Sequence, residues 1–127
     1  MENKFKNELA LKIGGVEILL RPTFENMAKM ETEMGGLAYL AYKYGQGINS
    51  VTGQIEPDKA AKAMPPMTEC AKIIYFNQVG TSYSLDEIFD LVMQEGLGIS
   101  GQIMIFLVRC TAGNKFQSEV SEAQKKS

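Results

Sequence analysis

The amino-acid sequence predicts an α+β fold in which an N-terminal antiparallel β-hairpin is followed by a small bundle of four to five helices. Large apolar residues stand at every second position on both sides of a Gly-Gly pair between Leu9 and Leu20, which is the period of a β-strand. From Phe24 onward they recur every three or four residues, as in a helix. The chain of 127 residues fits one domain. We assign this domain to residues 1–113, and we expect the polar residues 114–127 to form a disordered tail.

The β-hairpin is centred on Gly14 and Gly15. A two-residue hairpin loop needs positive φ angles, which glycine adopts without steric cost. The second strand ends at Arg21-Pro22, because proline has no N–H to donate to a neighbouring strand and disfavours a helical conformation in the preceding residue. A hairpin alone is marginally stable in water. We therefore expect either that the helices cover one of its faces or that hairpins of several subunits join into a larger sheet.

The first helix is predicted to begin after Thr23, whose side chain is a good N-cap, and to end at Gly35. Its apolar stripe begins at Phe24 and contains three methionines, Met27, Met30 and Met34. Such a stripe usually belongs to the core. A methionine face can also form an adaptable partner surface, because the side chain repacks at little cost. The sequence leaves both interpretations open for different parts of the stripe.

A second helix is predicted to begin near Leu37 and to end near Gly45, and it carries Tyr39 and Tyr42 three residues apart. Tyrosines at this spacing form an aromatic patch that suits either a partner surface or half-buried packing on the core. The following residues, 45–57, have the glycine and asparagine content of a loop. This loop could also become ordered on binding.

The remaining helices have clear start and stop signals. Residues 58–63 favour one or two helical turns before Pro65-Pro66, and a largely buried helix begins at Met67 or Thr68. Ser84 and Glu87 form a capping box for a helix that ends at Gly96. The apolar stripe of that helix comprises Leu85, Ile88, Phe89, Val92 and Met93.

Residues 103–108 are an unbroken apolar run, Ile-Met-Ile-Phe-Leu-Val. A helix that crosses a bilayer needs about 20 such residues, so this run predicts a central helix of the domain or of an oligomer. A short buried strand is the alternative, because isoleucine and valine are common in strands. The first residues of the chain do not resemble a signal peptide. We therefore expect a cytoplasmic protein that does not bind membranes.

The composition argues against several classes of function. Histidine, the most frequent general base and metal ligand, is absent. The formal net charge is −2 and no basic cluster occurs, which argues against nucleic acid as a partner. Cys70 and Cys110 each lack a neighbouring thiol, so two reduced cysteines are expected, with a single disulfide as the alternative.

Two patterns could suggest a site for a cofactor. Asp86, Glu87 and Asp90 form an acidic set, but carboxylates in the first turn of a helix are expected from the helix dipole alone. Gly96–Gly101 has the glycine spacing of a dinucleotide-binding loop. The true motif lies between a strand and a helix, whereas this one follows a helix. We expect no catalytic residue, metal or cofactor, and keep a small nucleotide-binding protein as an alternative.

A further set of residues marks turns, caps and helix ends in a recognisable order. It comprises Leu20-Arg21-Pro22-Thr23-Phe24 after the Gly14-Gly15 turn, Ala28, Met30-Glu31, Met34-Gly35, Ser84-Leu85-Asp86-Glu87-Ile88 and Gly96-Leu97, and an apolar helix ending near Ala112-Gly113. In this order and spacing, residues 5–113 resemble the small tail-assembly proteins of tailed phages and gene transfer agents. We interpret Arg21, Thr23, Glu31 and Gly35 as capping, turning and local pairing residues.

The resemblance implies a tail assembly chaperone, encoded by a prophage or a gene-transfer-agent cluster, that acts in the bacterial cytoplasm. Such a protein would shield the apolar surface of a tape-measure protein or of tail-tube subunits before they polymerise. We expect the partner to contact Met27, Met30, Met34, Tyr39 and Tyr42. A structural component of the tail tube or of its end is the alternative, and both roles are compatible with a homo-oligomer.

Overall fold

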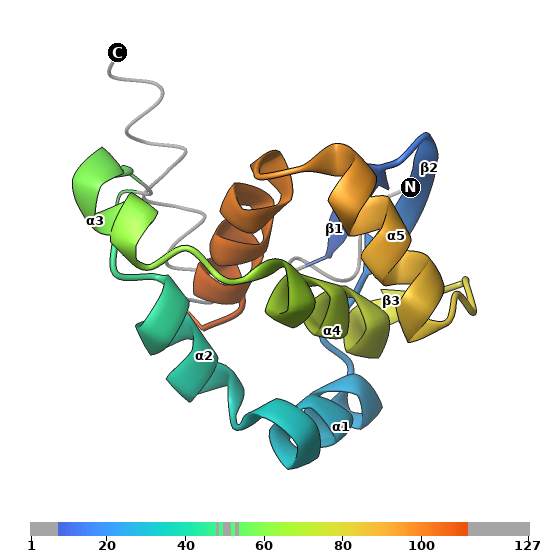
Figure 1. Cartoon of the computed structure of the whole chain (residues 1–127). Helices are drawn as coiled ribbons and strands as arrows, with labels where there is room; N and C mark the ends of the chain where they lie inside the picture. The colour runs from blue at the N-terminus through green and yellow to red at the C-terminus, as the bar shows by residue number, and fades with distance from the viewer. Residues whose placement is uncertain (1–7, 48, 50–51, 53, 112–127) are drawn as a thin grey trace, which may run out of the picture.

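The computed structural model describes residues 8–47, 49, 52 and 54–111 (Figure 1). The tail expected at residues 114–127 lies outside these described residues. So do part of the loop at residues 45–57 and the helix end expected near residue 113.

The strands form an antiparallel sheet with the order β1-β2-β3. β1 (Leu9–Ile13) and β2 (Val16–Leu20) pair in the register that brings Ile13 opposite Val16. The loop between them confirms the predicted hairpin, since Gly14 and Gly15 have φ angles of 54° and 83°. β3 (Gln78–Val79) was not predicted. A strand of two residues is too short to show an alternating pattern, and its place follows only from pairing with the end of β2.

Six helices occur within the described residues, and the α+β class is confirmed. They are α1 (Phe24–Met34), α2 (Leu37–Tyr44), α3 (Pro57–Lys62), α4 (Met67–Asn77), α5 (Leu85–Glu95) and a C-terminal helix at Gly98–Thr111. No single one of these helices has the length and apolar composition needed to cross a membrane. α5 and the C-terminal helix reach that length only as a pair, across a bend of 116°.

The helix ends follow the predicted caps. The Thr23 hydroxyl accepts a hydrogen bond from the backbone N–H of Asn26 at 3.1 Å, and Gly35 ends α1 with a φ angle of 96°. The backbone N–H of Glu87 donates to the Ser84 hydroxyl at 3.1 Å, and the Ser84 N–H donates to the Glu87 carboxylate at 2.9 Å. These bonds pair N–H groups that a helix start leaves without an intrahelical partner.

The helices cover one face of the hairpin, as one of the two predicted arrangements requires. The side chains on that face are fully or almost fully buried, namely Leu11, Ile13, Ile18 and Leu20, and α4 and α5 pack against these strands. The run at residues 103–108 is helical rather than extended, and most of its side chains are buried. Figure 1 shows this helix between α2 and α5, so the apolar run forms a central part of the core.

The polypeptide between the sheet and α1 is fixed by short polar contacts. The Arg21 guanidinium lies 2.7 Å from a Glu8 carboxylate oxygen, and the Arg21 backbone N–H donates to the carbonyl of Asn77 at 2.9 Å. The side-chain amide of Asn26 donates to the Arg21 carbonyl, also at 2.9 Å. Arg21 therefore takes part in local pairing with Glu8. These bonds connect the end of β2 to α1 and to α4.

Candidate protein-binding site

The methionine stripe of α1 lies largely inside the protein. Met30 is 0% exposed, and its sulfur lies 3.6 Å from the side-chain amide nitrogen of the buried Asn77. Met27 and Met34 are half-buried against the core. The prediction that all three methionines face a partner is therefore wrong for Met30. α1 packs on α4, and this stripe supplies the contact.

Phe24 was expected to lie on the same apolar stripe, but its side chain is 91% exposed. It occupies the first position of α1, directly after the Thr23 cap. The stripe that reaches the core therefore begins at Met27, one turn later. Phe24 adds to the accessible apolar surface of the folded chain.

α2 presents its two predicted tyrosines to solvent. Tyr39 is 56% exposed and Tyr42 is 75% exposed. On the opposite side of the helix, Leu40 and Tyr44 are buried, and the Tyr44 hydroxyl donates to the Glu69 carboxylate at 3.0 Å. The buried pair holds α2 in place, so the exposed tyrosines are free to contact another molecule.

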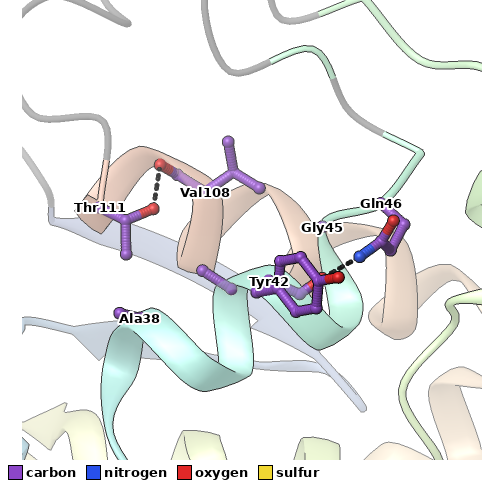
Figure 2. A pocket seen from close by; sticks show the side chains of 7 residues that line it. Ala38, Tyr42, Gly45, Gln46, Val108 and Thr111 are labelled. Carbon is purple, nitrogen blue, oxygen red and sulfur yellow. Dashed lines mark hydrogen bonds between the residues drawn. The ribbon is translucent and has the colours of Figure 1, made fainter.

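A hollow of about 360 Å³ lies beside Tyr42, between α2 and the C-terminal helix (Figure 2). Apolar and small residues from both helices line it, together with two polar side chains: Ala38, Ala41, Tyr42, Gly45, Gln46, Val108 and Thr111. Figure 2 shows hydrogen bonds from both polar side chains to backbone carbonyls, from Gln46 to Tyr42 at 2.9 Å and from Thr111 to Val108 at 3.1 Å. The surface left for a partner is therefore mainly apolar.

Gly45 allows the two helices to approach each other at the end of this hollow. A Cβ atom at this position would lie 2.8 Å from a methyl carbon of Val108 and would also clash with the carbonyl oxygen of Ala41. Only glycine fits without a shift of the neighbouring backbone. The sequence pattern marks Gly45 only as a helix end, so this second role was not predicted. Nothing in the local pattern connects it to Val108.

A positive charge lies next to the tyrosines of α2. The Lys43 ammonium is 5.8 Å from the centre of the Tyr39 ring and 5.0 Å from the centre of the Tyr44 ring. The Tyr44 side chain raises the pKa of Lys43, and Tyr39 contributes in the same direction. Lys43 is therefore cationic over the whole physiological range. The negative faces of the two aromatic rings attract the Lys43 ammonium, so this charge stays beside the tyrosines.

The two patterns that could suggest a cofactor remain without support. Gly96 ends α5 with a φ angle of 82°, while Gly98 and Gly101 belong to the next helix, so this glycine run joins two helices and does not follow a strand. Asp86, Glu87 and Asp90 are exposed, and the described residues contain no cluster of acidic, cysteine or histidine side chains that could hold a metal. Hydrogen bonding to Ser84 lowers the pKa of Glu87, as the capping box requires.

Both cysteines are free thiols. Cys70 is buried on α4, with its sulfur 3.7 Å from both the Ser100 hydroxyl and the Pro65 carbonyl. Burial raises the pKa of Cys70, and it raises the pKa of the half-buried Cys110 to about 12. Because the thiolate is the reactive form, neither residue is suited to nucleophilic chemistry at neutral pH.

The apolar stripe predicted for α5 is divided between the core and the surface. Ile88 and Val92 are fully buried, whereas Leu85 and Met93 are exposed. Five apolar positions on a helix of eleven residues cover a wider arc than one packing face needs. That excess was visible in the sequence, but it did not show which of the five positions would face solvent.

Comparison of the chain with protein-family models, with curated proteins and with solved structures found no match. The resemblance to tail-assembly proteins therefore remains a prediction from the residues quoted above.

Proposed function

We propose that the chain is a non-enzymatic phage or prophage tail assembly protein, a tail assembly chaperone of the bacterial host cytoplasm. It covers apolar surface on tape-measure or tail-tube subunits before they polymerise. The observation that carries this proposal is the pair of exposed tyrosines on α2 beside a hollow with an apolar floor. The resemblance to tail-assembly proteins supplies the class of partner.

The chemistry of this surface suits an apolar partner that must later be released. A tyrosine ring buries a large apolar area and keeps its hydroxyl in water. Exposed tyrosines can therefore cover an apolar helix of a partner and still be hydrated in the free protein. A closed cavity of about 150 Å³ is large enough for benzene, so the hollow has room for one aromatic or branched side chain. Interfaces of limited area are typical of transient complexes, and a chaperone needs a transient one.

The structural alternative, a component of the tail tube, has one observation in its favour. β1 forms the outer strand of the sheet, and within the part of the chain that the structure describes no strand pairs with its free side. Ala10 and Lys12 on this strand are exposed. An outer strand can pair with the same strand of another subunit and extend the sheet.

Size-exclusion chromatography with light scattering tests both roles. The chain is run alone and mixed with the tape-measure protein of the same gene cluster. The chaperone proposal predicts a mixed complex, which Tyr42→Ser weakens about tenfold. Tyr75→Ser is the matched control, because Tyr75 is another exposed tyrosine on α4 and does not line the hollow.

The outcomes separate the two candidates. If the chain alone forms rings or tubes and does not bind the tape-measure protein, the structural role is correct and the chaperone proposal is wrong. If a mixed complex forms but Tyr42→Ser and Tyr75→Ser weaken it equally, the α2 surface is not the binding site. A chaperone is also absent from finished particles, and mass spectrometry of purified particles checks this directly.

A further inference from the structure

The outer side of α5 carries an apolar ridge that the fold covers only in part. Leu85, Phe89 and Met93 are spaced by four residues, so their side chains form one of the oblique rows by which helices pack against each other. Leu85 is 37% exposed and Met93 is 55% exposed, and Phe89 is half-buried between them. Leu97, in the turn that follows α5, is 66% exposed.

This ridge is separate from the side of α5 that holds the helix in place. Ile88 and Val92 are fully buried and pack α5 against the rest of the chain. Exposed polar residues at the ridge positions would leave that contact intact. An apolar row whose two ends, Leu85 and Met93, are exposed is therefore typical of a surface that packs against another molecule.

The charged residues that α5 itself carries are all negative. Asp86 and Asp90 follow Leu85 and Phe89 in the sequence and form the next row on the same helix. Both are exposed, and neither carboxylate makes a hydrogen bond or an ion pair with another of the described residues. α5 carries no lysine or arginine. A partner that covers the ridge brings its own flanking side chains close to these two carboxylates.

We propose that the α5 ridge is a second docking surface, and that its occupant is an amphipathic helix with lysine or arginine beside its apolar stripe. The apolar row gives the contact area, and the two carboxylates select the basic flank. A second copy of α5 is disfavoured, because a symmetric contact would bring the carboxylates of one copy close to those of the other. An anionic membrane surface is disfavoured by the same repulsion.

The hollow is lined by α2 and the C-terminal helix, and Figure 1 shows α5 apart from α2, so the inference goes beyond the proposed function. A chain with two separate surfaces could hold one helix on α2 and another on α5. Loss of either surface leaves the other intact. The experiments on Tyr42 and on α5 can therefore fail independently.

Two synthetic peptides of about 18 residues, five helical turns, test the proposal. Both carry leucine at the same apolar positions, and the polar positions are lysine in one and glutamate in the other. Each is titrated into the full-length 15N-labelled protein while amide shifts are recorded. The lysine peptide is expected to bind with shifts that centre on α5, and the glutamate peptide is not. Added salt weakens the binding, because the selecting charges are exposed.

Matched variants locate the contact. Met93→Ser is expected to lower the affinity for the lysine peptide about tenfold. Met64→Ser makes the same change at an exposed methionine outside α5 and leaves the affinity unchanged. The double variant Asp86→Asn and Asp90→Asn weakens binding and also reduces its dependence on salt. Urea unfolding of each variant verifies that the fold is retained.

Three results would overturn the proposal. The shifts could centre outside α5, or the two methionine variants could weaken the peptide equally, and either result means that the peptide binds elsewhere. The free protein could also self-associate in a way that Met93→Ser abolishes. In that case the occupant of the ridge is a second copy of the chain.

Discussion

Helices α1 and α2 are neighbours in the sequence, yet their central large apolar side chains end in different places, one in the core and the others in solvent. Met30 of α1 is fully buried, while Tyr39 and Tyr42 of α2 are exposed. α1 has one apolar stripe among polar residues, so that stripe must face the core. α2 reads Leu-Ala-Tyr-Leu-Ala-Tyr-Lys-Tyr and is apolar on almost every side. Only one of its faces can be buried, and Leu40 and Tyr44 occupy that face.

The comparison teaches that helical spacing alone does not identify a binding surface. A stripe is a candidate for partner contact when the same helix already has another apolar face that satisfies the core. α2 meets this condition and α1 does not. α5 meets it as well, because Ile88 and Val92 supply its core contact.

The largest expected effect is a loss of stability when the buried methionine of α1 is shortened. Met30→Ala should lower the free energy of unfolding by about 3 kcal/mol, because it removes a fully buried side chain and leaves a cavity. Met93→Ala is the control at an exposed position and should cost no more than about 0.5 kcal/mol. Urea unfolding followed by circular dichroism measures both. Equal costs would mean that Met30 is not a core residue.

A smaller effect on stability is expected for a substitution on the buried face of α2. Tyr44→Phe removes the hydroxyl that donates to Glu69 at 3.0 Å, which should cost about 1 kcal/mol of stability. Tyr42→Phe removes an exposed hydroxyl and should leave the stability unchanged. A substantial loss for Tyr42→Phe would show that the two faces of α2 are not as different as the structure indicates.

The hydrogen-bonded pair Tyr44 and Glu69 predicts that the free energy of unfolding depends on pH. Burial raises the pKa of Tyr44 and the hydrogen bond to Glu69 raises it further, with partial opposition from Lys43. The unfolded chain therefore loses this proton first, near the ordinary pKa of about 10. The stabilisation is complete below that pH and is lost as the pH rises toward the folded-state pKa. Unfolding at a series of pH values above 9 should show a smaller decline for Tyr44→Phe than for Tyr42→Phe.

The smallest effect on stability is expected for the exposed tyrosines. Tyr39→Ser and Tyr42→Ser should each change the free energy of unfolding by no more than about 0.5 kcal/mol, although both should weaken partner binding. Thermal unfolding of the two variants checks that their stability is nearly unchanged. Destabilisation as large as that of Met30→Ala would assign these tyrosines to the core and remove the argument for a binding surface on α2.

The elements with strong local signals could be predicted from the sequence. The Gly14-Gly15 loop, the Thr23 cap and the capping box at Ser84 each depend on residues close together in the chain. β3 could not be predicted, since its two residues become a strand only by pairing with Leu19 and Leu20.

The candidate site was predicted in part. The tyrosines were found from their spacing, but their exposure depends on which face of α2 the rest of the chain covers. The hollow depends on the approach of Gly45 to Val108, 63 positions later in the sequence. Which apolar residues of α5 face solvent is likewise decided by long-range packing, because the core covers only part of its apolar stripe. Contacts between distant segments decide all three features, and no local pattern encodes them.

Because the thiols are protonated in the native chain, their rate of alkylation reports local unfolding of the helix around them. A pKa of about 12 leaves almost no thiolate on Cys110 at neutral pH, so an alkylating reagent reacts mainly when the surrounding helix loosens. Cys110 lies on the C-terminal helix, beside the Thr111 that lines the hollow. A partner seated against that helix would suppress such openings. The labelling rate of Cys110 should therefore fall when the α2 surface is occupied.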